Sequence, residues 1–217
     1  CSEEAGKKAF NNKKFTVINN GLLLENYKYN ITQRDSIRKK LNIPKDCFVF
    51  GMVGRLSKGK NNIYALEVFK NIKEDSKYKD SKFLMIGNGE MKHNIINYIS
   101  DNNLTKDVIM LEGITDIYNY YMAMDCFIFP SLHEGLGMVL IEAQATGLPC
   151  FCTNTLPKEV FISNLVKGLE LEKGPKYWAE KIIKDKLERK DVMKNIIKAG
   201  FSIEDESFKL KEIYIDD

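Results

Sequence analysis

Two glutamates eight positions apart, Glu134 and Glu142, stand in residues 129–150, which read FPSLHEGLGMVLIEAQATGLPC. Gly135 and Gly137 lie between them, where a helix-forming run begins. Glycines beside a helix start let backbone N–H groups approach a ligand closely, and the helix dipole favours a negative group there. Carboxylates beside such an anion site can accept hydrogen bonds from hydroxyl groups. The combination suits a ligand that carries both phosphate and hydroxyls, as a sugar nucleotide does.

The neighbours of Glu142 favour a ligand role for its carboxylate. The run 138–146 around it is almost entirely apolar, so little solvent-facing surface remains for a charged side chain. A glutamate in such surroundings is rarely buried unless it is paired or bound to something. The alternatives are a surface helix residue for Glu142 and a solvated loop acid for Glu134. His133 stays open between a solvent-facing or structural histidine and a catalytic one.

A second group of candidate residues lies in residues 53–61, VGRLSKGKN, between an apolar run and a helical pattern. In an open α/β sheet, ligands bind at the carboxyl ends of the strands, where this turn belongs. Arg55 can hold a diphosphate bidentately, and Lys60 can add a point charge. The pattern GxxxxGK[ST] of a P-loop is absent. The alternative is that both cations are simply solvated.

Two further glycine turns follow strand-like runs. Residues 86–91 read IGNGEM, but Lys92 takes the place of the third glycine of a GxGxxG fingerprint, so a tight βα turn is the alternative. Residues 111–115 read LEGIT, in which Gly113 precedes a helix start. This turn is either a backbone rim for a nucleobase or a plain turn.

The chain alternates short apolar runs with longer amphipathic ones, which predicts an α/β fold with a Rossmann-like, doubly wound parallel sheet. We expect strands at 15–19, 48–53, 82–86, 108–111, 126–129, 149–152 and 168–171. We expect helices at 33–41, 62–74, 91–102, 116–122 and 138–146. A helical C-terminal tail is expected at 176–187, 191–199 and 203–215.

Composition excludes several classes of protein. The 217 residues are 44% hydrophobic and 29% charged, as in an ordinary soluble globular protein. The net charge of +3 comes without a basic stripe interleaved with aromatics, so a nucleic-acid partner is not expected. No apolar run approaches the ~20 residues that span a bilayer, and the start has no signal-peptide core, so we expect a cytoplasmic protein. The five cysteines and two histidines show no metal-ligand spacing, so no metal site is expected.

Taken together, these motifs resemble the C-terminal nucleotide-binding half of a GT-B glycosyltransferase. Within that fold, the chain is similar to the retaining enzymes known as glycosyl transferases group 1, or family four. The specific part is the E-x7-E spacing inside an EG-x-G-x-x-x-x-EA pattern at 134–143. VINNGL at 17–22, VGRLSKGKN at 53–61 and IGNGEM at 86–91 extend the resemblance over nearly the whole chain.

The resemblance implies a role for each candidate residue. Arg55 and Lys60 would hold the donor diphosphate, and Glu134 would read the donor sugar. Glu142 would accept hydrogen bonds from the ribose hydroxyls. Further contacts to the phosphates, the sugar and the base are implied at Gly54, Gly87, Gly113, Ile114, Gly135, Leu136, Gly137, Met138 and Val139.

The activity that the resemblance implies is transfer of a hexosyl group from a nucleotide-diphosphate sugar, UDP-linked, to an acceptor. Transfer would retain configuration and need no metal, because cations and helix amides neutralise the leaving diphosphate. The chain is most similar to the bacterial subgroup that builds exopolysaccharide or capsule on lipid-linked acceptors at the inner face of the cell membrane. The alternatives are a non-catalytic nucleotide-sugar-binding subunit and a sugar-nucleotide epimerase.

The resemblance also implies how the chain divides. Residues 1–14 would be the remnant of an inter-domain segment, 15–200 the donor-nucleotide-binding domain, and 201–217 a crossover helix. The N-terminal half that binds the acceptor would be a missing partner, so this fragment alone is expected to be inactive.

Overall fold

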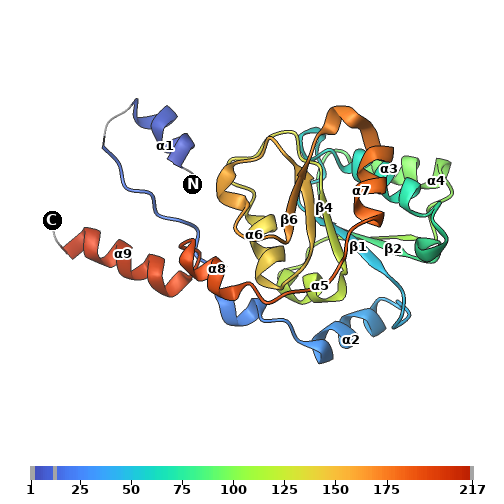
Figure 1. The fold of residues 1–217 in the computed structure, drawn as a ribbon, viewed down its shortest axis with the longest axis horizontal. Helices are drawn as coiled ribbons and strands as arrows, with labels where there is room; N and C mark the ends of the chain where they lie inside the picture. Colours follow the sequence, from blue (N-terminus) through green and yellow to red (C-terminus); the bar gives the residue numbers. More distant parts are fainter. Residues whose placement is uncertain (1–2, 12–13, 216–217) are drawn as a thin grey trace.

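A parallel sheet organises the computed structural model, which describes residues 3–11 and 14–215 (Figure 1). Its six strands lie in the order β3-β2-β1-β4-β5-β6, and every neighbouring pair is parallel. This is the order of a Rossmann-like fold, so the predicted fold class is confirmed. The strands are β1 Val49–Val53, β2 Lys82–Ile86, β3 Val108–Leu111, β4 Cys126–Phe129, β5 Cys150–Thr153 and β6 Val166–Leu169.

Helices cover both faces of this sheet. On one side α3 contacts α4 and α7, and on the other α5 contacts α2 and α6 (Figure 1). Each predicted helix is present, with ends that differ by a few residues. The helices are α1 Glu3–Phe10, α2 Ile31–Lys40, α3 Asn62–Ile72, α4 Lys92–Asp101, α5 Ile117–Ala123, α6 Met138–Ala145, α7 Gly174–Ile183, α8 Met193–Lys198 and α9 Ile203–Ile215.

The strand predicted at residues 15–19 is wrong, because this segment lies outside the sheet. The chain here runs against the segment that precedes α9. The N–H of Leu22 donates to the carbonyl of Phe201 at 2.8 Å, and the N–H of Ile203 donates back to Leu22 at 3.1 Å. The carboxylate of Glu206 accepts the N–H of Asn19 at 2.8 Å. The end of this segment is thus held by residues near the C-terminal end of the chain and not by a strand of the sheet.

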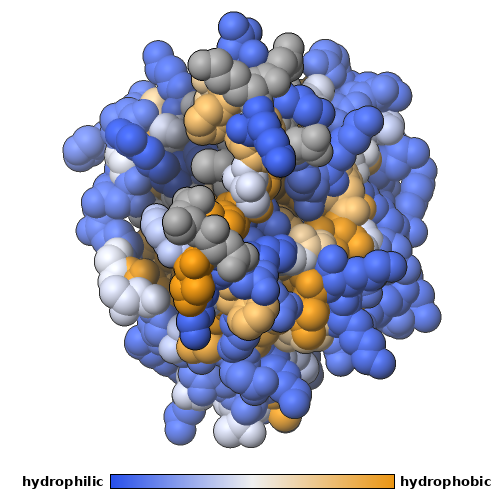
Figure 2. Space-filling view, turned by 90° about the vertical axis from the view of Figure 1, so that its left-hand side faces the viewer, coloured by the Kyte–Doolittle hydropathy of each residue, from blue (hydrophilic) through white to orange (hydrophobic). Residues whose placement is uncertain are grey.

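Beyond its first turn, α9 carries exposed apolar side chains, among them Phe208, Tyr214 and Ile215. Figure 2 shows this end of the molecule, where apolar side chains interrupt a mostly hydrophilic surface. The crossover role of 201–217 and the other domain boundaries remain predictions. Residues 1–2, 12–13 and 216–217 of those predicted segments lie outside the described part of the chain.

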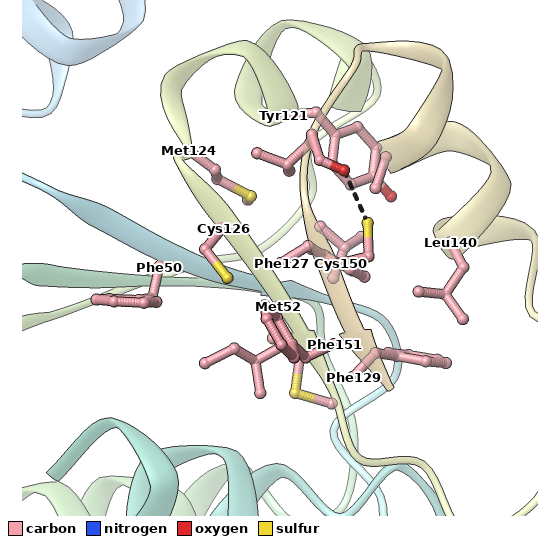
Figure 3. Packing of buried hydrophobic residues seen from close by; sticks show 14 of the residues in the cluster. Phe50, Met52, Tyr121, Met124, Cys126, Phe127, Phe129, Leu140, Cys150 and Phe151 are labelled. Carbon is pink, nitrogen blue, oxygen red and sulfur yellow. Dashed lines mark hydrogen bonds between the residues drawn. The ribbon is translucent and has the colours of Figure 1, made fainter. Parts of the chain in front are cut away.

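The core lies on both faces of the sheet, as Figure 3 shows for Phe50 of β1, Phe127 of β4 and Phe151 of β5. Every residue of β1, β4 and β5 is buried. Strands that helices cover on both sides have no solvent face, which explains their continuous apolar sequences. Cys126 and Cys150 belong to this core, and burial raises the pKa of both thiols well above the ordinary value.

A charged cluster joins α2, β1 and β4 at the amino end of the sheet. The carboxylate of Asp125 accepts hydrogen bonds from Arg34 at 2.6 Å, from Arg38 at 2.7 Å and from the N–H of Val49 at 2.8 Å. Arg38 is 2% exposed and also donates to the carbonyl of Ala123 at the end of α5. Each group in the cluster has a partner, and the cluster joins α2, β1 and β4.

We expect Asp125→Ala to lower the free energy of unfolding by about 3–5 kcal/mol, because it leaves the buried Arg38 guanidinium without its counter-charge. Urea denaturation measures the loss. Asp35→Ala is the control: its partner Lys45 lies 3.9 Å away and is 79% exposed, so we expect a change below ~1 kcal/mol. Equal losses in the two variants would contradict a structural role for the cluster.

Candidate functional site

Two pockets open at the carboxyl ends of the strands, where β1 and β4 are neighbours. The connections from these two strands leave to opposite faces of the sheet, and open α/β sheets bind ligands at such a point. The first, the α6 pocket, is lined by Asn20, Lys60, Glu134, Gly135, Leu136, Gly137, Met138 and Val139. The second, the glycine-turn pocket, is lined by Val53, Gly54, Arg55, Ile86, Gly87, Asn88, Gly113, Ile114 and Ile117.

The wall of the α6 pocket is the start of α6. Gly137 precedes the helix with φ of +88°, a left-handed conformation that favours glycine. No side chain of the described residues caps the helix at Gly137. A Cβ added at Gly135 would meet no atom within 4 Å, so the backbone there faces open space. Met138 and Val139, the first residues of α6, therefore line an open pocket, and free amides at a helix start are groups that can bind an anion.

An ion pair crosses this pocket. Nζ of Lys60, from the turn after β1, lies 2.5 Å from Oε1 of Glu134, in the loop after β4. The two side chains are only 23% and 9% exposed. The ammonium also lies 5.2 Å from the ring centroid of Phe129, and the hydroxyl of Ser131 donates to the same Oε1 at 2.5 Å. The Lys60 ammonium, the Glu134 carboxylate and the start of α6 therefore lie together in the α6 pocket, where the two charged groups are partly shielded from water.

The two predicted diphosphate ligands line different pockets. Arg55 is 72% exposed in the glycine-turn pocket, and its Nε lies 3.3 Å from the carboxylate of Glu90. Lys60 lines the α6 pocket. Gly54, which precedes Arg55 in the chain, lies beside the other cation, since a Cβ there would stand 3.8 Å from Cε of Lys60. Each cation has a glutamate partner.

Two glycines of the glycine-turn pocket, Gly87 and Gly113, are required for different physical reasons. A Cβ at Gly87 would stand 1.8 Å from the carbonyl oxygen of Gly54, so only glycine lets the turns after β1 and β2 lie together. Gly113 has φ of +68°, and a Cβ there would meet nothing within 4 Å. The close packing of two turns is therefore enough to explain the glycine at position 87. At Gly113, beside Ile114, the backbone is open to a ligand.

Glu142 points from α6 toward α5 and lines neither pocket. Its Oε2 accepts the hydroxyl of Tyr121 at 2.8 Å. Burial raises the pKa of the Glu142 carboxyl, and the hydrogen bond from Tyr121 opposes this in part. Burial, with the charge of Glu142, also raises the pKa of Tyr27. No hydrogen bond of the described residues ends on Oε1 of Glu142, which leaves one acceptor open.

Sequence reasoning missed three residues of the site: Asn20, Ser131 and Tyr121. Ser131 stands inside the central motif, three positions before Glu134, and Asn20 belongs to VINNGL, so both signals were present. Tyr121 had no signal, because only the packing of α5 on α6 brings it to Glu142. His133 is exposed and lines neither pocket. Within the described residues, no three His, Cys, Asp or Glu side chains gather as metal ligands.

A family model described as glycosyl transferases group 1 matches residues 33–202, which include both pockets apart from Asn20. The chain belongs to this family. The resemblance drawn from the motifs is thereby confirmed. Within the described residues, no helix of this group 1 glycosyl transferase combines the length and apolarity that crossing a membrane requires.

Several named relatives of this group 1 glycosyl transferase are glycosyltransferases of bacteria. The UDP-Gal:alpha-D-GlcNAc-diphosphoundecaprenol alpha-1,3-galactosyltransferase of Escherichia coli is 34% identical over 213 residues, which cover 94% of this chain and 54% of that protein. The capsular polysaccharide biosynthesis glycosyltransferase CapM of Staphylococcus aureus is 34% identical over 181 residues, 79% of this chain and 46% of that protein. The chain spans about half the length of these curated relatives.

The structure of Anabaena HepE in complex with UDP and glucose shares the fold of this group 1 glycosyl transferase. The TM-score is 0.77 at 17% identity, over 99% of this chain and 62% of that one. The C-terminal domain of LpcC from Francisella tularensis, at 22% identity and a TM-score of 0.67, is covered over its whole length.

We expect Glu142→Gln to raise the melting temperature at pH 7 by about 2–4 °C, roughly the effect of 1 kcal/mol in a domain of this size. The folded-state pKa of Glu142 is raised, so the folded state carries a buried charge at neutral pH that the amide removes. The gain should shrink as the pH falls through the folded-state pKa toward 4, where the native carboxyl is protonated. Calorimetry at both pH values measures it.

Glu180→Gln, in an exposed glutamate of α7, is the matched control and should change little at either pH. A melting temperature of Glu142→Gln below that of the wild type at pH 7 would show that the charge of Glu142 stabilises the fold.

Proposed function

We propose that this chain is the donor-binding part of a hexosyltransferase, which transfers a hexosyl group from a nucleotide-diphosphate sugar to an acceptor. The observation that carries the proposal is the α6 pocket, where Lys60, Glu134 and the open start of α6 meet. Positive groups there suit a diphosphate, and the carboxylate suits sugar hydroxyls. The galactosyltransferase relative and the HepE complex with UDP-glucose support this ligand class.

The chemistry follows from charge that grows as the bond between sugar and diphosphate breaks. The amides of Met138 and Val139, together with Lys60, would stabilise the leaving diphosphate. Lys60 is mostly shielded from water, so its charge acts in a medium of lower dielectric constant. Arg55, whose side chain is mostly exposed, would bind the same group bidentately. Glu134 would accept hydrogen bonds from the hexose.

The nucleoside would lie along the glycine-turn pocket. Gly113 and Ile114 would contact the base through their backbone, beside the turns at Gly54 and Gly87. The open Oε1 of Glu142 would accept a ribose hydroxyl, with Tyr121 holding the other oxygen. Backbone contacts discriminate bases weakly, so UDP is the proposed nucleotide on the strength of the relatives' names.

We further propose transfer with retention and without a metal, because the cations and helix amides supply the positive charge that a metal would. The acceptor is proposed to be lipid-linked and met at the inner face of the cell membrane during surface polysaccharide synthesis, as the diphosphoundecaprenol and capsule relatives suggest. A separate N-terminal GT-B domain would bind it, consistent with relatives about twice as long as the matched chain.

We expect Glu142→Ala to abolish measurable nucleotide binding in titration calorimetry with UDP, GDP and ADP, because the ribose loses its carboxylate partner. The same panel on the wild type identifies the base. Glu180→Ala is the control and should bind like the wild type. Unchanged affinity of Glu142→Ala for the best nucleotide would refute the ribose assignment.

We expect Lys60→Ala, in a protein that includes the acceptor-binding part, to lower kcat by about 10²–10³, as loss of one donor to a developing anion does. Acceptor affinity should be nearly intact. Lys58→Ala removes a charge from the same turn outside the α6 pocket and should keep most of the rate. Initial rates with donor and acceptor test both, and a full rate for Lys60→Ala would refute the diphosphate role.

A further inference from the structure

Ser131 is a buried hydroxyl at the edge of the α6 pocket. It follows β4 and Pro130, and its side chain is 0% exposed. Three acceptors surround Oγ: Oε1 of Glu134 at 2.5 Å, the carbonyl of Gly59 at 3.1 Å and the carbonyl of His133 at 3.3 Å. A hydroxyl has one proton to donate. The shortest contact is to the charged acceptor, where a hydrogen bond is strongest, so the proton belongs to Glu134.

Both hydrogen-bond donors to Glu134 meet the same oxygen. The hydroxyl of Ser131 and the ammonium of Lys60 each lie 2.5 Å from Oε1. In the described part of the chain, no hydrogen bond ends on Oε2. The carboxylate lines the α6 pocket, so its free acceptor is Oε2. An ionised carboxylate only accepts hydrogen bonds, and Oε2 therefore selects a ligand group with a proton to donate.

The two donors differ in how firmly they are held. Lys60 has a long flexible stem and is proposed to stabilise the leaving diphosphate. Ser131 has one short rotatable bond and is fully buried. Its loop is anchored, because the N–H of Leu132 donates to the carbonyl of Gly59 at 2.8 Å. If the Lys60 ammonium leaves Glu134 to bind the diphosphate, the Ser131 hydroxyl is the remaining hydrogen-bond donor to Oε1 of Glu134.

We propose that Ser131 is a positioning residue for the donor sugar: its hydroxyl holds Glu134 by Oε1, so that Oε2 accepts a hydrogen bond from a hydroxyl of the hexose. This rests on the proposed donor site. A sugar that presents a hydroxyl or an amide N–H at this point is accepted, and one that presents a carboxylate is repelled.

Titration calorimetry of wild type, Ser131→Ala and Ser131→Cys tests the proposal, with UDP, UDP-glucose, UDP-galactose and UDP-N-acetylglucosamine as probes. The measured quantity is the ratio of the affinity for the best sugar nucleotide to that for UDP. We expect Ser131→Ala to lower this ratio about 5–10-fold, the size of effect that loss of one ordinary hydrogen bond has, with UDP affinity within about twofold. Ser131→Cys keeps a weaker donor of similar size and should fall between.

Ser81→Ala is the matched control. Its hydroxyl is also buried, at 2% exposure of the residue, and donates to the carbonyl of Tyr78 at 2.6 Å, at the opposite end of the sheet. Both alanine variants should lose similar thermal stability, but Ser81→Ala should keep the wild-type ratio. A wild-type ratio in Ser131→Ala overturns the proposal, and so does an equal loss for UDP and its sugars.

A wild type that binds neither UDP nor any of the three sugar nucleotides contradicts the donor site itself, and the role of Ser131 falls with it. That result is visible in the first titration, before any variant is made. If the wild type binds sugar nucleotides and Ser131→Ala has the same affinity ratio, the positioning role of Ser131 is refuted. The proposed donor site is not contradicted by that result.

Discussion

β1 and β4 are neighbours in the sheet, although two other strands and three α-helices separate them in the chain. Their register pairs Phe50 with Cys126 and Gly51 with Phe127. Gly51 makes this packing possible, since a Cβ there would stand 2.2 Å from Sδ of Met124. The pairing brings the turn after β1 and the loop after β4 to one edge. The contact between Lys60 and Glu134, 74 positions apart, follows from it.

The two ends of this strand pair differ in how completely their charges are satisfied. At the amino end, Asp125 uses both oxygens on Arg34, Arg38 and the backbone of β1. At the carboxyl end, Glu134 and Glu142 each keep an oxygen without a hydrogen bond from the described residues, and α6 begins without a cap. Open acceptors and amides in partly buried places cost stability, and they are what a ligand can use. The amino end stabilises the fold and the carboxyl end is free for binding.

Much of the architecture was predictable, because the signals for it are local. Apolar runs of four to six residues predicted β1 to β5, and the alternation of these runs with amphipathic ones predicted a parallel sheet. The sixth strand, expected at 168–171, is β6 at Val166–Leu169, where the two middle residues are exposed and the apolar signal is weak. The segment 15–19 carries the same local signal as β1 to β5, yet Asn19 at its end donates hydrogen bonds to Gly200 and Glu206, at the far end of the chain. Apolar character alone does not distinguish a sheet strand from a segment that packs elsewhere.

The sequence by itself determined the family, through the spacing of Glu134 and Glu142 around two glycines, because that spacing is a property of one short segment. It also predicted, from the apolar run around Glu142, that this carboxylate has a ligand role, which stays a prediction. Only the tertiary structure decided that its partner is Tyr121, that Arg55 and Lys60 line different pockets, and that Ser131 shares an oxygen of Glu134 with Lys60. These are distances between side chains of different elements, and the packing of helices on the sheet sets them.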